Sequence, residues 1–218
     1  MIYKTHELFD TNYTLAKPLL DGCEYPHEAL PRIGEFIKKI STELDSSYKD
    51  IGDGVFLADD AKIWDGATIV GPTIIGHGAE IRPGAFIRGN ALIGDGAVIG
   101  NSTEVKNAIV FDGAQLPHYN YVGDSIIGHK AHMGAGAIAS NLRLDKKEIV
   151  LKSEDERINS GLKKIGVFLG DSAEVGCGSV LCPGSIVGRE AMVYPLSVVR
   201  GTIPAHSIYD GKSVKEKH

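Results

Sequence analysis

The stretch IGHGAEIRPGAFIRGNALIGDGAVIG, residues 75–100, has an isoleucine at every sixth position. This aliphatic column extends in both directions, and a small residue stands four places after nearly every member. The first block contains Leu57, Ile63, Ile69, Ile75, Ile81, Ile87, Ile93, Ile99 and Val105. The column resumes in a second block with Leu169, Val175, Leu181, Val187, Val193 and Val199. Two columns that stay in phase over this length indicate a repeated structural unit.

A period of six residues fits neither a helix nor a plain alternating strand, but it fits a short strand followed by a sharp turn. Three such units close a triangular coil of about eighteen residues, and coils stack about 4.8 Å apart. The composition agrees, because 27 glycines and only 7% aromatic residues suit many tight turns and small inward side chains. The sequence therefore predicts an all-β fold, a parallel β-helix of hexapeptide repeats.

The N-terminal 50 residues do not follow this period. Within residues 27–45, apolar side chains recur at helical spacing, and a solenoid needs its ends covered. We therefore expect residues 1–50 to form a helical extension or cap, and residues 51–218 to form the β-helix domain. A charged segment near residues 142–166 separates the two regular blocks, so we expect an inserted loop there.

Two irregularities interrupt the repeat. After Val105 the aliphatic column continues through Phe111, Leu116, Val122 and Ile127. Its step falls from six residues to five between Phe111 and Leu116 and again between Val122 and Ile127, around the stretch LPHYNYVGDS of residues 116–125, which predicts shortened turns. The second irregularity is the insertion itself, and long loops in compact folds are usually functional or disordered. Both lie between the same two regular blocks. The sequence therefore predicts that the functional site lies in this region.

Composition and charge narrow the class of protein. No apolar run approaches the roughly 18 residues of a membrane span, and the stretch MIYKTHELFD at the start lacks the pattern of a signal peptide. We expect a cytoplasmic protein with no membrane partner. A net charge of -5 argues against a nucleic-acid partner, which leaves a small molecule as the expected ligand.

Arg88 and Lys106 are eighteen residues apart, so they should stack in neighbouring coils. Like charges opposed across strands destabilise each other unless something neutralises them. A phosphate group on a substrate would do so. The spacing therefore makes Arg88 and Lys106 candidate phosphate-binding residues.

The motifs RPGAFIRG, GNSTEVKNA, LPHYNYVGDSIIG, MGAGAIASNLRLDKKE and KKIGVFLGDSAEVG occur in this order between about residues 70 and 205. This run resembles the C-terminal acetyltransferase domain of bifunctional sugar-1-phosphate nucleotidyltransferases, which are related to UDP-N-acetylglucosamine pyrophosphorylase. The resemblance implies a left-handed β-helix, acetyl-CoA as co-substrate and a homotrimer. It also implies N-acetylation of an amino-sugar phosphate, of the glucosamine-1-phosphate or galactosamine-1-phosphate type. The Gly-rich opening of the nucleotidyltransferase domain does not occur in this sequence, so we expect no nucleotidyltransferase domain.

The same resemblance assigns roles to single residues. His118 matches the general base, and an imidazole suits the removal of a proton from an ammonium substrate at neutral pH. Glu104 matches the carboxylate that orients this histidine. Backbone N–H groups in MGAGAI, residues 133–138, could stabilise the oxyanion of the acyl group, with Ala135 and Gly136 as the cofactor-binding residues. The residues matched to substrate binding are Arg82, Lys106, Tyr121, Asn141 and Lys147.

Each of these residues also has a structural interpretation, as a solvated charge or a packed side chain. Two other classes of protein stay open. His118, His129 and His132 could hold zinc, as in hexapeptide-repeat carbonic anhydrases. A non-catalytic sensing or assembly module would keep the site without turnover. We favour the acetyltransferase with no metal, in which the insertion projects from the helix and brings Lys147 to the sugar phosphate.

Overall fold

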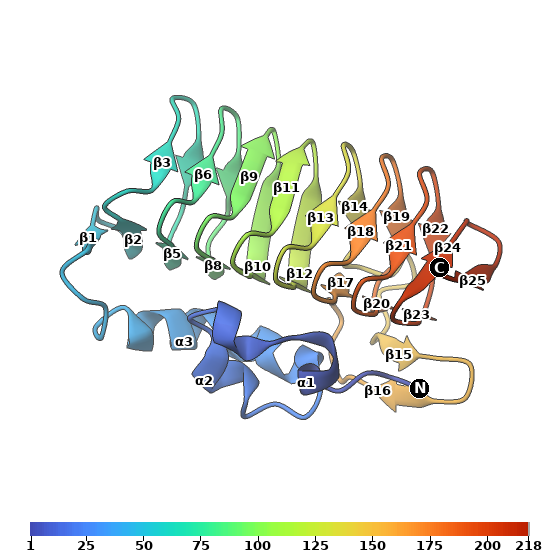
Figure 1. The fold of residues 1–218 in the computed structure, drawn as a ribbon. Helices are drawn as coiled ribbons and strands as arrows, with labels where there is room; N and C mark the ends of the chain where they lie inside the picture. Colours follow the sequence, from blue (N-terminus) through green and yellow to red (C-terminus); the bar gives the residue numbers. More distant parts are fainter. Residues whose placement is uncertain (218) are drawn as a thin grey trace.

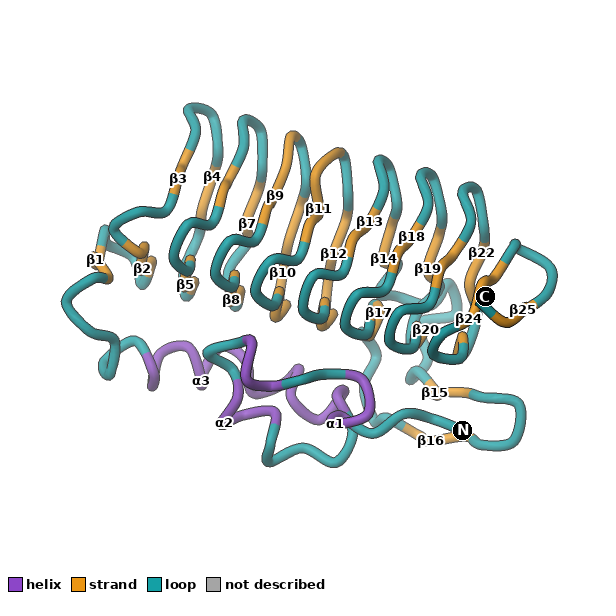
Figure 2. The backbone as a smooth tube through the Cα atoms, in the orientation of Figure 1, coloured by secondary structure: helices purple, strands orange, loops and turns teal. Residues whose placement is uncertain are grey.

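A computed structural model describes residues 1–217. From residue 48 onward the chain winds into stacked coils with three faces, in which short strands alternate with turns (Figures 1 and 2). The registers follow the predicted spacing, because Ile75 pairs with Ile93 eighteen residues on. Val105 pairs with Val122 only seventeen residues on, because the step from Val105 to the next inward residue, Val110, is one residue shorter. The chain is thus a left-handed parallel β-helix, as the repeat and the resemblance predicted.

The three faces share one pattern of short parallel strands. The first face contains β3 (Lys62–Ile63), β6 (Glu80–Ile81), β9 (Val98–Asn101), β11 (Gln115–His118), β13 (His132–Met133), β18 (Glu174–Val175), β21 (Met192–Val193) and β24 (Ser207–Tyr209). The second face contains β4 (Thr68–Ile69), β7 (Phe86–Ile87), the starts of β10 (Glu104–Val110) and β12 (Tyr121–Ile127), β14 (Ile138–Ala139), β19 (Val180–Leu181) and β22 (Val198–Val199). The third face contains β2 (Val55–Ala58), β5 (Thr73–Ile75), β8 (Ala91–Ile93), the ends of β10 and β12, β17 (Val167–Leu169), β20 (Ser185–Val187) and β23 (Thr202–Ile203).

The predicted aliphatic column fills the interior of the coils. From Ile75 to Val187 the inward side chains are almost completely buried, together with the alanines of the small column. One member differs from the prediction: Val110 points inward, whereas Phe111 packs outside the coil against Phe9. Leu57, Ile63 and Ile69 of the first coil are only partly buried. Small residues at the second column let the three faces approach closely, which explains why the two columns stay in phase.

Antiparallel strands close both ends of the stack. β1 (Tyr48–Asp50) pairs with β2, and β25 (Val214–Glu216) pairs with β24. Each of these strands occupies the hydrogen-bonding edge that a terminal coil would otherwise expose, which is a known way to prevent association of edge strands.

The N-terminal segment is helical, as predicted, but it covers a side of the coils and not an end. It contains α1 (Thr5–Leu8), a 3-10 turn (Thr11–Tyr13), α2 (Lys17–Leu20), a longer 3-10 stretch (Pro26–Arg32) and α3 (Ile33–Ile40). These elements run alongside the third face (Figure 1). No helix within residues 1–217 is long and apolar enough to cross a bilayer.

The reason for this placement is the outward surface of the third face, which is apolar. Its buried outward residues form a second core with the helices. They are Ile74, Leu92, Ile109, Ile126, Phe168 and Ile186, with Phe56 partly buried beside them. Burying this stripe removes a large apolar area from water, so the helices dock on the third face.

Candidate functional site

His118 is exposed at the edge between the first and second faces, in a turn of regular length, because Leu116 and Val122 both point inward six residues apart. The two five-residue steps run from Val105 to Val110 and from Val122 to Ile127, at the opposite edge of the second face. β11 ends at His118, and the next residue, Tyr119, has a positive φ of 52°. Asn120 is buried, and its Nδ2 donates hydrogen bonds to the carbonyls of Gly134 and Ala137 in the next coil, at 2.8 and 3.2 Å. Asn120 Oδ1 accepts the backbone N–H of His118 at 3.2 Å. The buried amide therefore holds this turn while the imidazole faces solvent.

The glycine-rich turn lies directly beside this histidine, as expected. The N–H of Gly136 donates to the carbonyl of His118 at 3.0 Å, and Gly136 has a positive φ of 70° that favours glycine. The N–H of Gly136 is thus already used. The N–H of Ala135 has no acceptor within residues 1–217 and is free to meet another group.

Glu104 differs from our expectation. Its Oε1 accepts a hydrogen bond from Arg88 Nη1 at 2.7 Å, and no hydrogen bond joins it to His118 within residues 1–217. The hydrogen bond to Glu104 raises the pKa of Arg88. Glu104 lies opposite Tyr121 in the register of β10 and β12, so the chain places the carboxylate on the second face, where an arginine of the preceding coil reaches it.

The two predicted phosphate-binding cations are stacked as the spacing indicated, because the N–H of Arg88 donates to the carbonyl of Val105, the neighbour of Lys106. Carboxylates neutralise both of them: Arg88 pairs with Glu104, and Lys106 Nζ lies 3.3 Å from Asp124 Oδ2. The repulsion between Arg88 and Lys106 that the sequence indicated is therefore offset by carboxylates of the protein.

Arg82 does not join these cations. It lies at the end of β6 on the first face, where Arg82 Nη2 pairs with Glu80 Oε2 at 3.0 Å. This pairing is the main reason that the pKa of the Glu80 carboxyl is lowered. Of the two arginines in RPGAFIRG, only Arg88 is in the part of the molecule that contains Lys106.

Asp124 is the centre of this region, and sequence reasoning missed it. Its side chain is 7% exposed and accepts from Lys106 Nζ, from Asn107 Nδ2 at 3.0 Å and from Asn141 Nδ2 at 2.6 Å. We call Lys106, Asn107, Asp124 and Asn141 the Asp124 cluster. It lies at the edge between the second and third faces. Asp124 follows Asn107 by seventeen residues, the length of a coil in this contracted part, and this spacing was the signal that could have identified it.

Tyr121 lies against the Asp124 cluster. Burial is the main cause that raises the pKa of its hydroxyl, and the nearby Glu104 carboxylate adds to this effect. Tyr121 Oη and Asn141 Nδ2 lie 2.6 and 2.7 Å from the point where a Cβ of residue 123 would be, so only glycine fits between them. Gly123 thus allows the tyrosine and the asparagine to meet.

The insertion is partly packed against the protein. Ile149, Leu151 and Ile165 are buried in the second core, and β15 (Val150–Lys152) pairs with β16 (Arg157–Asn159) as a hairpin. Lys147 is exposed, and only its backbone N–H is engaged, with Asp145 Oδ1 at 3.3 Å. Arg143 pairs with Asp145, which holds the pKa of that carboxyl well below its usual range. The ammonium of Lys147 therefore lies in solvent. In the sequence, Lys147 follows Asn141 of the Asp124 cluster by six residues.

The histidines considered for zinc have separate partners. His129 Nδ1 hydrogen-bonds the carbonyl of Asp112, and its ring stacks on Tyr13 with centroids 3.8 Å apart. His132 Nδ1 lies 2.8 Å from Glu174 Oε2 on the first face. These partners explain both imidazoles without a shared metal.

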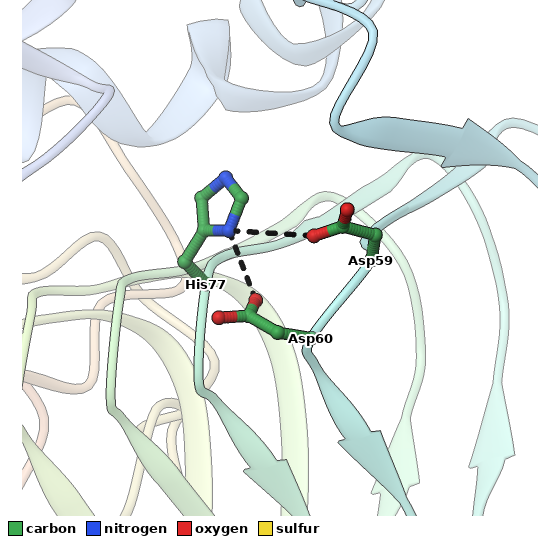
Figure 3. Close-up of side chains that lie close together, drawn as sticks. All are labelled: Asp59, Asp60 and His77. Atoms are coloured by element: carbon green, nitrogen blue, oxygen red, sulfur yellow. Dashed lines mark hydrogen bonds and ion pairs between the residues drawn. The ribbon is translucent and has the colours of Figure 1, made fainter.

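Another group of potential metal ligands lies at the first coils, where Asp59, Asp60 and His77 converge (Figure 3). His77 Nδ1 is 2.9 Å from Asp60 Oδ1 and 3.9 Å from Asp59 Oδ1, and the hydrogen bond to Asp60 raises the pKa of the imidazole. Asp60 also accepts the N–H of Gly78, and His77 Nε2 meets Ser47 Oγ. Hydrogen bonds between neighbouring coils account for this group.

The stacked hexapeptide coils place the chain among hexapeptide-repeat proteins. The family model described as the GMPPB C-terminal domain matches residues 69–217. The chain belongs to this family. The helical segment described above lies outside the matched range.

The most similar curated relatives have the kind of name that the motifs suggested. A bifunctional sugar-1-phosphate nucleotidylyltransferase/acetyltransferase of Sulfurisphaera tokodaii is 41% identical over 101 residues, which are 46% of this chain and 25% of that protein. The bifunctional protein GlmU of Methanocaldococcus jannaschii is 38% identical over 95 residues, 44% of this chain and 23% of that protein. The chain thus covers about a quarter of these relatives. The predicted resemblance is confirmed.

Among solved structures, PerB from Caulobacter crescentus, in complex with CoA and GDP-perosamine, aligns with a TM-score of 0.40 and 18% identity. The alignment covers 74% of this chain and 56% of that one.

Proposed function

We propose that this chain transfers the acetyl group of acetyl-CoA to the amine of a hexosamine 1-phosphate, of the glucosamine or galactosamine type. The observation that carries the proposal is the exposed His118 beside the glycine-rich turn, in a chain whose curated relatives are named acetyltransferases. His118 is the group that takes the proton of the substrate ammonium.

The chemistry follows from this arrangement. Once the proton has passed to the His118 imidazole, the amine attacks the thioester carbonyl of acetyl-CoA. The carbonyl oxygen becomes an oxyanion, and the free N–H of Ala135 is the backbone donor that meets it. The nitrogen of the tetrahedral intermediate loses its second proton to solvent, collapse breaks the carbon–sulfur bond, and the thiolate of CoA receives the proton held by the imidazolium, so that one proton is released overall. The products are the acetamido sugar phosphate and free CoA thiol.

The acceptor contacts come from the Asp124 cluster and its neighbours. Lys106 and Asn141 are held in place by a buried carboxylate, and Tyr121 adds a hydroxyl. We assign substrate binding to these residues together with Arg88, Arg82 and Lys147, with Glu104 as the partner of Arg88. Acetyl-CoA approaches along the edge that carries Ala135 and Gly136.

The distance between the edge that carries His118 and the edge that carries the Asp124 cluster favours a site shared between subunits. His118 and Asp124 are six residues apart, and an extended strand rises about 3.3 Å per residue, so the two edges are up to about 20 Å apart. A hexosamine phosphate is shorter than this span. We therefore propose a homotrimer in which one subunit supplies His118 and its neighbour supplies the Asp124 cluster.

The proposed activity is tested by release of free thiol from acetyl-CoA with glucosamine 1-phosphate, galactosamine 1-phosphate and nucleotide-linked amino sugars. We expect thiol release that depends on the amino sugar. A sample that releases no thiol with any acceptor would contradict the enzyme and support the sensing or assembly module. Mixing His118→Ala with Asn141→Ala subunits under exchange conditions tests the shared site, because only intersubunit sites would recover activity.

A further inference from the structure

A cavity of about 690 Å³ lies where the inserted hairpin meets the last coils. Figure 1 shows β15 and β16 beside β20 and β23 at this end of the molecule. The cavity is on the same edge as the Asp124 cluster, because Ser140 and Leu142, the neighbours of Asn141, line it. The residues that matter below are Arg143, Leu144, Lys152, Pro183 and Arg200.

The walls of this cavity are held by specific contacts. Thr202 Oγ1 donates a hydrogen bond to the carbonyl of Lys152 at 2.8 Å, which fixes the end of β15 on the last coils. Gly184 and Gly201 have positive φ values of 77° and 81°, and the hairpin packs directly on them. A Cβ on Gly184 would lie 2.6 Å from Ile149 Cγ2. The two glycines therefore make room for the hairpin that forms one wall.

The cavity collects positive charge that the protein does not neutralise. Lys152 and Arg200 are exposed, and neither forms an ion pair within residues 1–217, whereas Arg143 pairs with Asp145. Arg88 and Lys106 of the same edge are both paired with carboxylates. Unpaired cations that line a hollow attract an anionic ligand. Lys152 and Arg200 thus give the cavity an excess of unpaired positive charge.

The cavity also has an apolar wall. Leu142 is 40% exposed and Leu144 is fully exposed, and both line the cavity with Ile149 and Pro183. Apolar walls with a few placed polar groups are typical of sites for organic ligands, which measure roughly 300–1,000 Å³. A single phosphate group would leave most of this volume empty. The ligand therefore combines anionic groups with a larger body.

We propose that this cavity binds a nucleoside diphosphate moiety. Lys152 and Arg200 contact the two phosphates, and the apolar wall receives the base. The moiety has two possible sources: a nucleotide-linked amino sugar, whose sugar would extend toward Asn141, or the nucleotide part of acetyl-CoA. The assignment of a source rests on the proposed function, but the binding of the nucleotide does not.

Calorimetry on the full chain tests the site, with UDP, ADP and inorganic phosphate as probes. We expect UDP or ADP to bind, and phosphate to bind much more weakly. Arg200→Gln and Lys152→Gln should each weaken nucleotide binding at least about tenfold, because a charge-assisted hydrogen bond is lost. The matched control is Arg157→Gln, which removes an exposed cation of the same hairpin outside the cavity. Absence of nucleotide binding, or equal affinity in Arg200→Gln and wild type, would overturn the proposal.

Steady-state kinetics then separate the sources. If the nucleotide belongs to the acceptor, Arg200→Gln raises KM for a nucleotide-linked amino sugar and leaves KM for acetyl-CoA unchanged; if it belongs to acetyl-CoA, the reverse holds. If the chain binds nucleotide but transfers no acetyl group, the nucleotide site is supported and the proposed function is wrong. If the chain acetylates a hexosamine phosphate but binds no nucleotide, the proposed function is supported and the nucleotide site is wrong.

Discussion

The turn at His118 and the Asp124 cluster lie at opposite edges of the second face, and they are built differently. His118 is exposed, and its imidazole has no partner within residues 1–217. Asp124 is almost completely buried and accepts hydrogen bonds from three side chains. The protein thus leaves the reactive group free to meet a substrate, and it prepares the binding groups in advance.

Because of this difference, a mutation at one edge should affect turnover, and a mutation at the other should affect stability and binding. A group without partners is removed with little effect on stability, so a change there reports on chemistry. A buried carboxylate with three donors supports the local fold, so a change there affects both stability and binding. The following predictions test this contrast.

The largest effect is expected at His118. His118→Ala should lower turnover by roughly 10² to 10⁴, the usual contribution of a general base, while the midpoint of thermal unfolding changes little. The measurement is thiol release at saturating substrate together with a thermal scan. Tyr119→Asn is the matched control, since it changes an exposed neighbour whose positive φ asparagine tolerates. Turnover equal to wild type in His118→Ala would return this residue to a structural role.

Asp124→Asn should reduce the free energy of unfolding by about 3 kcal/mol, because it leaves the partly buried ammonium of Lys106 without its counter-charge. Chemical denaturation measures this value. Glu174→Gln is the control, because it breaks an exposed pair with His132, and such pairs contribute about 0 to 1 kcal/mol. If the two variants lose the same free energy of unfolding, the hydrogen bonds of the Asp124 cluster do not support the local fold.

Lys147→Ala tests whether the insertion reaches the acceptor. Loss of a charge-assisted contact to phosphate should weaken transition-state binding of the sugar phosphate by roughly 1.5 to 3 kcal/mol, mainly through KM, with KM for acetyl-CoA unchanged. Lys49→Ala, at an exposed position of β1, is the control. A KM for the sugar phosphate that does not move would make this part of the insertion a solvated loop.

Much of the architecture could be predicted from residue spacing. The column from Ile75 to Val105 specifies an inward side chain every sixth residue, and register then follows because slipping by one residue would expose the whole column. The stacking of Arg88 on Lys106 came from the same count. The count misplaced the first shortened step, because it took Phe111 and not Val110 as the inward residue. The covered third face was also present in the sequence, since Ile74, Leu92 and Ile109 recur at coil spacing outside the main column. The helices were predicted, and this second apolar column indicates that they dock on the third face.

Only the tertiary structure decided how charges and hydrogen bonds pair around the site. A period places residues in columns, but it does not say which of several neighbours within reach a long side chain will choose. Glu104 meets Arg88 and not His118, and Asp124 accepts from two donors of β10 and from Asn141, two residues after β14. The cavity beside Arg200 exists because an insertion without any period folds back onto two glycines. These outcomes depend on distances of a few ångströms between separate coils, which side-chain packing sets and spacing alone does not.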